Sequence, residues 1–399
     1  MADVFRRFGP GYRAAKAGHL SLGQLKAMSS IEMCRTAELG GHVEACEDCG
    51  IVRCAYNSCR SRSCPKCQSS AAQKWLAARQ EELLPVQYFH VVFTIPEQLN
   101  GIAYQNKAAV YGLLFKATAE TLQTIAADPK RLGARLGFTA VLHTWGSALT
   151  HHPHVHCIVP GGGVSPDGKK WVRCRRNYLF PAKVLSPLFR RLFLTGLNAA
   201  FKAGELEFHG SQQQFADAKA FAELLAPLWD CKWVVYAKAP FSGPEQVLEY
   251  LARYTHRIAI SNSRLMSVSE KGVTFRWKDY RRKGGERKQV MTLAPEEFIR
   301  RFLLHILPDG FHRIRYYGLF ANGQRKANLE LCRKLLAVAV LAHKTAALNC
   351  ASCGPPQPLW DPCICPYCGG HMVVIERIAP LRSRAPKRHP WRLDGVAPP

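Results

Sequence analysis

The spacing of apolar residues along the first half of the chain predicts an alternation of strands and helices. Short apolar runs that are rich in β-branched residues predict strands at 88–95, 137–145 and 155–160. Helical periodicity predicts helices at 76–84 and 106–127. The polar connection between the second and third strands predicts a hairpin, which the three glycines after it bring to an end.

The second half of the chain also shows patterns typical of strands and helices. A strand is expected at 232–238, and the runs 273–280 and 288–293 flank Gly284-Gly285, which predicts a second hairpin. The helices expected in this half are 187–203, 215–228, 244–255, 295–306 and 328–348. Together these elements predict an α+β fold in which helices pack on one face of a central antiparallel sheet.

Changes in composition divide the chain into four expected domains. A cysteine-rich segment (1–75) precedes a central α+β domain (76–265), in which 167–228 is interpreted as a helical insertion. A basic hairpin and helices follow (266–348), and a second cysteine-rich segment with a basic tail ends the chain (349–399).

Charge narrows the classes of partner. The 399 residues hold 55 Lys and Arg against 29 Asp and Glu, a net charge of +26, which favours a phosphate-rich partner or an acidic membrane. No run approaches the roughly 20 apolar residues of a membrane-spanning helix, and the first residues lack the apolar stretch of a signal peptide. We therefore expect a cytoplasmic protein, and the 47% of hydrophobic residues excludes global disorder.

The 16 cysteines are clustered, with seven between Cys34 and Cys67 and five between Cys350 and Cys368. Paired CxxC motifs in a cytosolic chain are typical of zinc sites, although such cysteines can also be reduced core residues. The spacing predicts two ribbons with four thiolates each, and four thiolates leave no open coordination position, so both ions would be structural. The expected groups are Cys46, Cys49, Cys64 and Cys67 in the first ribbon, and Cys350, Cys353, Cys365 and Cys368 in the second.

Further cysteines lie beside these groups. Cys363 is either a spare or a substitute ligand of the second ribbon. Four residues near the first ribbon would suffice for another zinc ion, although each could equally be a core or surface residue. They are Cys34, His42, Cys54 and Cys59.

The densest histidine run of the chain, 151–156, overlaps the third predicted strand. His154 and His156 are two residues apart, so both imidazoles project from one face of a strand. That arrangement suits a divalent cation with open positions, although a strand can carry two histidines without any metal. Tyr250 and Tyr254 lie one helical turn apart on a predicted helix. They are core aromatics or, taken with the histidines and the charge, nucleophiles that attack a phosphodiester.

Together these motifs resemble the two-tyrosine HUH transposases of the insertion sequence 91 type, over nearly the whole chain. The strongest matches are the histidine segment 152–157 and the tyrosine segment 250–257. Further matches are 34–36, 40–42, 46–50, 56–59, 64–68, 90–94, 160–163, 298–302 and 310–318. Relatives often have His where this chain has Ser63, so the second zinc ion of the head either is lost here or uses Cys54.

The resemblance implies a transposase that nicks and rejoins single-stranded DNA through a 5′-phosphotyrosine, in rolling-circle-like transposition. It makes Tyr250 and Tyr254 the nucleophiles, and His154 and His156 ligands of Mg²⁺ or Mn²⁺. The third ligand is open, with His143 as the first choice and His90 or His256 as alternatives. Competing interpretations are a zinc-ribbon DNA-binding protein without chemistry, and a related replication initiator or relaxase.

The predicted second hairpin carries the DNA-binding candidates. Basic residues mixed with aromatics suit a single strand, because phosphates meet the charges while bases stack on the rings. The aromatics Phe275, Trp277 and Tyr280 could equally form a half-buried face of a solvated hairpin. The basic candidates are Arg276, Lys278, Arg281, Arg282, Lys283, Arg287 and Lys288. A second basic segment, 377–392, is expected to form a flexible arm.

Overall fold

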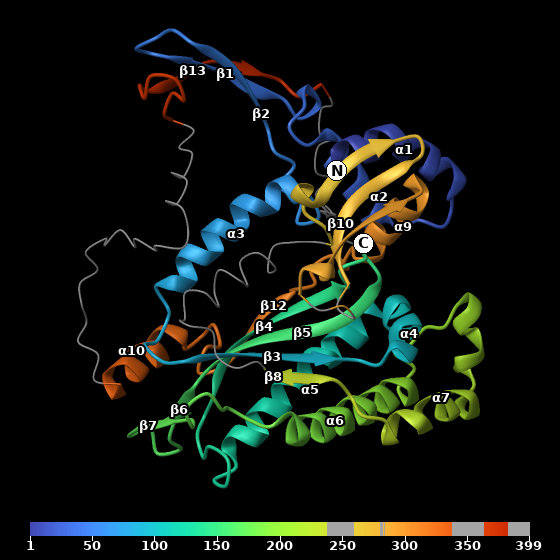
Figure 1. Ribbon diagram of the computed structural model, residues 1–399, viewed down its shortest axis with the longest axis vertical. Coiled ribbons are helices and arrows are strands. Elements are labelled where there is room, and N and C mark those ends of the chain that lie inside the picture. The colour runs from blue at the N-terminus through green and yellow to red at the C-terminus, as the bar shows by residue number, and fades with distance from the viewer. Residues whose placement is uncertain (238–258, 280–281, 283, 337–362, 382–399) are drawn as a thin grey trace, which may run out of the picture.

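The computed structural model describes residues 1–237, 259–279, 282, 284–336 and 363–381 (Figure 1). At its centre lies a five-stranded sheet in the order β12-β4-β5-β3-β8, and every neighbouring pair is antiparallel. Its strands are β3 (Tyr88–Thr94), β4 (Gly137–Trp145), β5 (His151–Pro160), β8 (Val235–Ala237) and β12 (Ile314–Gly318). The predicted α+β fold with a central antiparallel sheet is confirmed.

Helices from two stretches of the chain pack into one core with this sheet, and α5 and α6 run beneath the strands (Figure 1). They are α4 (Asn100–Gln105), α5 (Lys107–Ala127), α6 (Ala182–Lys202) and α7 (Ala218–Asp230). Alternate residues of β3, such as Val91 and Phe93, join Phe115 of α5 and Phe189 of α6 in the largest hydrophobic core of the described residues. Helices α6 and α7, which lie in or overlap the segment interpreted as an insertion, therefore contribute to this core.

The opposite face of the sheet is only partly covered. Helix α3 (Pro65–Gln80) crosses one end of it, where Trp75 packs against Tyr88 and Ile158. The Trp75 indole also donates to the hydroxyl of Tyr316 on β12, at 3.1 Å. The expectation of helices on one face is therefore wrong in part: the second face is capped at one end and open at the other.

A second core joins the N-terminal helices to elements that follow residue 258. It combines α1 (Ala2–Ala15) and α2 (Leu22–Met33) with α9 (Pro295–Leu304) and a three-stranded sheet, and Phe5, Phe275 and Phe298 are among its residues. The sheet has the order β11-β10-β9, with β9 (Leu265–Ser269), β10 (Gly272–Lys278) and β11 (Lys288–Leu293). This core crosses the boundaries expected near 75 and 266.

Two smaller sheets and one helix complete the described elements. β1 (Gly41–Cys46) lies between β2 (Val52–Tyr56) and β13 (Met372–Ile378), so a C-terminal strand belongs to an N-terminal sheet. β6 (Gly162–Val164) pairs with β7 (Trp171–Arg173), and α10 (Arg325–Leu335) follows β12. No described helix is both long and apolar enough to cross a membrane.

Most predicted elements of the described chain are found, and the differences have local causes. β4 and β11 have the expected bounds, and β5 begins four residues earlier than expected because the strand continues through Pro153. Helix α3 begins at Pro65 rather than near residue 76, since proline suits the first turn of a helix. The helix expected at 244–255 lies outside the described residues.

Candidate functional site

The open end of the central sheet carries a cluster of histidines. Side chains alternate along a strand, and in β5 Val155 and Cys157 enter the large core. The residues between them, His154 and His156, therefore face the other way, and line a cleft together with His143 of β4. The two-residue spacing in the sequence has the expected consequence: both imidazoles lie on one face.

His143 completes a group of three. The register pairs His143 directly with His154 across β4 and β5, and the ring centroids of His143 and His156 are 4.2 Å apart. One nitrogen of each ring lies within 4.8 Å of those of the other two. Of the three candidates for a third ligand, His143 joins the pair. His90 contacts one member of the pair instead, and His256 lies outside the described residues.

Hydrogen bonds fix which nitrogen atoms these rings can offer. Nδ1–H of His154 donates to the backbone carbonyl of His152 at 2.6 Å, which leaves the lone pair on Nε2. Nδ1 of His156 lies 2.6 Å from Nε2 of His90, so Nε2 is the nitrogen of His156 that lies outside this hydrogen bond. Burial lowers the pKa of His154 to about 3 and keeps the imidazole neutral, the form that binds metal. The donor set fits a divalent cation with open positions.

A basic wall faces the histidines across a cleft of about 680 Å³. This wall is formed by the β9–β11 sheet and the turn before β9, and four cations line the cleft from it: Arg264, Arg276, Lys278 and Lys288. Trp277 lines the same wall, and Trp145 lies on the histidine side, with its ring stacked on His143 at 4.8 Å. The cleft therefore offers cations and aromatic faces opposite three imidazoles.

The turn between β4 and β5 joins the two walls. The backbone N–H of Lys278 donates to the hydroxyl of Ser147 at 2.6 Å, and the guanidinium of Arg264 donates to the Ser147 carbonyl. Leu149, with a φ of 63°, inserts from the same turn into the second core. These contacts hold the basic sheet over the histidine face.

Only some of the basic residues predicted to bind DNA line the cleft. Arg276, Lys278 and Lys288 line the cleft. Arg282 and Arg287 lie beyond it at the end of the hairpin, where Arg287 donates to the Arg282 carbonyl at 2.7 Å. The expected residues Arg281 and Lys283 lie outside the described residues.

The aromatic residues of the hairpin also lie in different environments. Phe275 is fully buried and packs against Phe298, with ring centroids 5.7 Å apart, so Phe275 is a core residue. Trp277 lines the cleft, and Tyr280 lies outside the described residues. In the second basic segment, Arg377 belongs to β13 rather than to a flexible arm.

Two cleft residues, Arg264 and Tyr236, were not among the candidates from the sequence. Arg264 precedes β9, a strand that periodicity did not predict, and Tyr236 lies on the short strand β8. The alternation along β8 could have indicated Tyr236, since its neighbour Val235 is buried in the core. The candidate nucleophiles Tyr250 and Tyr254 lie outside the described residues.

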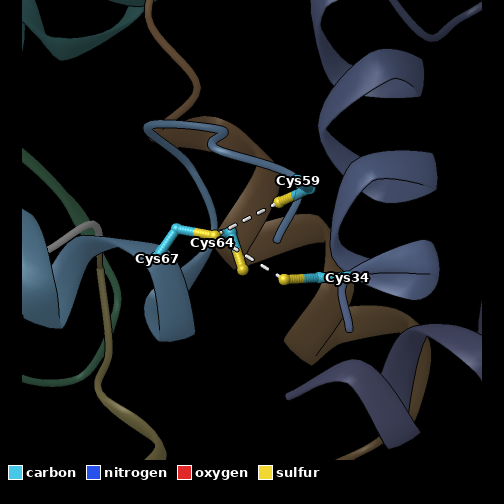
Figure 2. Close-up of side chains that lie close together, drawn as sticks. All are labelled: Cys34, Cys59, Cys64 and Cys67. Carbon is cyan, nitrogen blue, oxygen red and sulfur yellow. Dashed lines mark hydrogen bonds between the residues drawn. The ribbon is translucent and has the colours of Figure 1, made fainter. Parts of the chain in front are cut away.

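The cysteines form two groups of four, but the groups differ from those that spacing predicts. Cys64 and Cys67 meet Cys34 and Cys59 at the junction of α2 and α3 (Figure 2). The Sγ atom of Cys67 is 3.6 Å from that of Cys34 and 3.5 Å from that of Cys59. Four thiolates about 2.3 Å from one zinc ion in a tetrahedron lie roughly 3.8 Å from one another, so this group fits zinc.

The second group is Cys46, Cys49, Cys365 and Cys368. The two CxxC motifs of the head therefore do not form one group of potential ligands, as their spacing had predicted. The reason is that Cys46 and Cys49 lie at the β1–β2 hairpin, away from α3. Cys363 is exposed and lies outside both groups, and Cys350 and Cys353 lie outside the described residues.

The remaining head candidates lie apart from the metal groups. His42 pairs with Glu44 at 2.7 Å, and Cys54 is exposed on β2. Neither residue belongs to the groups of potential ligands among the described residues. Cys34 and Cys59 thus join Cys64 and Cys67 in one group of potential ligands rather than forming a group of their own.

Comparison with known proteins identifies two family regions. A family described as "Transposase zinc-binding domain" matches residues 4–95, which include the group around Cys64. A family described as "Putative transposase" matches residues 137–328, which include the histidines and the basic sheet. No solved structure matches the chain significantly.

Two curated relatives extend over most of the chain. "Putative transposase y4qJ" of Sinorhizobium fredii is 59% identical over 342 residues, 86% of this chain and 85% of that protein. "Transposase for insertion sequence element IS801" of Pseudomonas savastanoi pv. phaseolicola is 27% identical over 374 residues, 90% of this chain and 85% of that protein. The chain therefore belongs to the family of insertion sequence 91 type transposases.

Proposed function

We propose that the protein is an HUH endonuclease and transposase that cleaves and rejoins single-stranded DNA during rolling-circle-like transposition. One observation carries this proposal: three histidine nitrogens gather at the floor of a cleft whose opposite wall is basic. A transposase must hold phosphate next to a group that stabilises its developing charge, and this cleft brings both requirements together.

His143, His154 and His156 are the proposed ligands of Mg²⁺ or Mn²⁺. When bound there, the cation would polarise the oxygens of the scissile phosphate. Three protein ligands leave positions for those oxygens, in contrast to a site with four thiolates. His90 orients His156 through the 2.6 Å contact between Nε2 and Nδ1.

The proposed DNA path runs between the two walls of the cleft. Arg264, Arg276, Lys278 and Lys288 bind phosphates, and the rings of Trp145 and Trp277 offer stacking surfaces for unpaired bases. Stacking of this kind needs bases without partners, so the cleft suits single-stranded transposon ends and target strands. Counterion release would make the affinity depend on salt.

Tyr250 and Tyr254 are the proposed nucleophiles. A tyrosine oxygen attacks the phosphorus, the P–O3′ bond breaks, and the phenol proton ends on the departing 3′ hydroxyl. The 5′ phosphate stays on the tyrosine and keeps the bond energy, so attack by a 3′ hydroxyl rejoins the strand without ATP. A second tyrosine one turn away allows a second cleavage while the first end is held.

A covalent-adduct assay tests this function. The full chain is incubated with Mg²⁺ or Mn²⁺ and single-stranded DNA that carries the end of its own element, then separated under denaturing conditions. We expect a protein–DNA adduct for the wild type and none for Tyr250→Phe/Tyr254→Phe, which keeps both rings. The exposed Tyr178→Phe is the matched control and should form the adduct normally.

Two outcomes would contradict the proposal. An adduct formed by the double Phe variant would reassign the nucleophile. DNA binding without any adduct in the wild type would favour a DNA-binding protein without chemistry.

A further inference from the structure

Cys46, Cys49, Cys365 and Cys368 come from opposite ends of the sequence and meet in space. The Sγ atoms of Cys46 and Cys368 are 3.4 Å apart, and those of Cys49 and Cys365 are 3.7 Å apart. These separations are close to the roughly 3.8 Å expected between thiolates that share one tetrahedral zinc ion. Residues 365–368 lie outside both regions that the family comparisons match.

The two CxxC motifs have the same backbone geometry. In the first, the N–H of Gly50 donates to the carbonyl of Cys46 at 3.0 Å; in the second, the N–H of Gly369 donates to that of Cys365 at 3.0 Å. Both glycines adopt the left-handed conformation, with φ of 66° and 79°. Each motif thus forms the tight turn that directs two sulfurs toward one point, and the two turns face each other.

The contact between the two turns is close and specific. A Cβ atom on Gly370 would lie 2.2 Å from a carboxylate oxygen of Asp48, in the first motif, so any other residue there would force the Asp48 side chain to move. Beyond the turns, β13 pairs with β1 from Cys46↔Met372 to Gly41↔Ile378. The C-terminal strand therefore occupies the edge of β1 opposite β2.

Apolar burial alone cannot hold this sheet together. Its hydrophobic cluster consists of Cys46, Cys365 and Met372, while Val52, Val374 and Ile375 remain exposed. Small modules with so little core depend on a metal or a covalent link for stability, and binding of a structural metal is coupled to folding.

We propose that Cys46, Cys49, Cys365 and Cys368 form a single zinc site that fastens the C-terminal strand β13 to the N-terminal sheet. The two halves of this ribbon are separated in the sequence by the whole catalytic region. Without the C-terminal segment, the N-terminal sheet lacks the strand β13 and two of the four proposed zinc ligands. It requires zinc and both motifs, and it is independent of the proposed cleavage chemistry.

Zinc content of purified full-length variants tests the site. Cys46→Ser/Cys49→Ser and Cys365→Ser/Cys368→Ser should each lose one zinc ion per chain. The quadruple variant should lose that same single ion, because both pairs serve one site. Cys363→Ser, next to the motif but outside the group, and Cys350→Ser/Cys353→Ser should retain wild-type zinc. A loss of two ions in the quadruple variant, or loss of this ion in Cys350→Ser/Cys353→Ser, would overturn the proposal.

A second measurement uses only the wild-type chain and avoids variants that fail to fold. Diamide is present while a chelator removes the zinc, so that thiols which shared one ion are oxidised as it leaves and before the sheet opens; each disulfide gives two protons and two electrons to the reagent. Peptide mapping should find links that join Cys46 or Cys49 to Cys365 or Cys368, and adding zinc before diamide should suppress them. The proposal is overturned if Cys365 and Cys368 form links only to other cysteines, or form none.

Discussion

The histidine cluster and the cysteine clusters are both potential metal sites, but they differ in ligand number and surroundings. Three imidazoles from two strands line a cleft, whereas each cysteine cluster supplies four thiolates. Four thiolates saturate a tetrahedral ion, while three histidines leave room for substrate oxygens. The histidine cluster therefore has the open positions that metal-assisted cleavage would need, whereas the cysteine clusters suit structural ions.

The two cysteine clusters also differ from each other. Cys34 and Cys64 belong to an extensive core built from α1, α2, α9 and β10. Cys46 and Cys365 share their cluster with Met372 alone. A metal ion in the first cluster would add stability to a region that already has a hydrophobic core. In the second cluster, the metal would be the main source of stability, because the hydrophobic core is so small.

The largest expected effect comes from the histidines. His154→Ala/His156→Ala should reduce adduct formation at least about a hundredfold, because metal stabilisation of a phosphoryl transition state contributes several kcal/mol. Zinc content should stay at the wild-type value, and the exposed His209→Ala should react normally. The distinction between chemical and structural metals fails if cleavage survives in the double variant, or if its zinc is lost.

The second effect distinguishes the cysteine clusters. Cys64→Ser/Cys67→Ser should lower the melting temperature of the main unfolding transition, because the ion links α2 to α3 within the second core. Cys365→Ser/Cys368→Ser should leave that transition in place and expose the β1 edge to protease. Calorimetry with limited proteolysis checks both, and identical melting curves for the two variants would remove the difference.

The third effect concerns the basic wall. Replacing Arg276, Lys278 and Lys288 with Gln should reduce the salt dependence of single-strand affinity by about two logarithmic units per unit of log salt, at about 0.7 per phosphate contact. A matched triple variant of exposed cations elsewhere, Lys130, Arg131 and Lys202, should leave the slope unchanged. Equal slopes in the two triple variants would argue against the cleft as the DNA path.

The smallest expected effect comes from His90. Replacing His90 with Ala should weaken Mn²⁺ binding about tenfold, since an outer partner orients a ligand without touching the metal. Titration with Mn²⁺ measures this change. Complete loss of binding would make His90 a ligand, and unchanged affinity would remove its positioning role.

Much of the central sheet and its site could be predicted from local sequence. Two-residue alternation places His154 and His156 on one face, and the hairpin brings His143 opposite His154. The strand β12 escaped prediction because its five residues show no two-residue alternation: the first four are all partly buried. Arg264 escaped because tertiary contacts, rather than periodicity, bring it to the cleft.

The grouping of the cysteines could not be predicted from spacing. Two CxxC motifs close in the sequence look like one ribbon, yet β1 and β2 carry Cys46 and Cys49 away from α3, where Cys64 lies. Their actual partners, Cys365 and Cys368, become neighbours only when β13 pairs with β1. Spacing in the sequence predicts which two cysteines share a turn, but the tertiary fold determines which two turns come together.

Counting the two kinds of metal in one sample tests the central claim most directly. Zinc is measured in the purified chain, and Mn²⁺ is then titrated by electron paramagnetic resonance. The account predicts one bound Mn²⁺ beside the thiolate-bound zinc, lost in His154→Ala/His156→Ala and kept in Cys46→Ser/Cys49→Ser. Mn²⁺ binding that survives removal of the histidines, or that disappears with the cysteines, would contradict it.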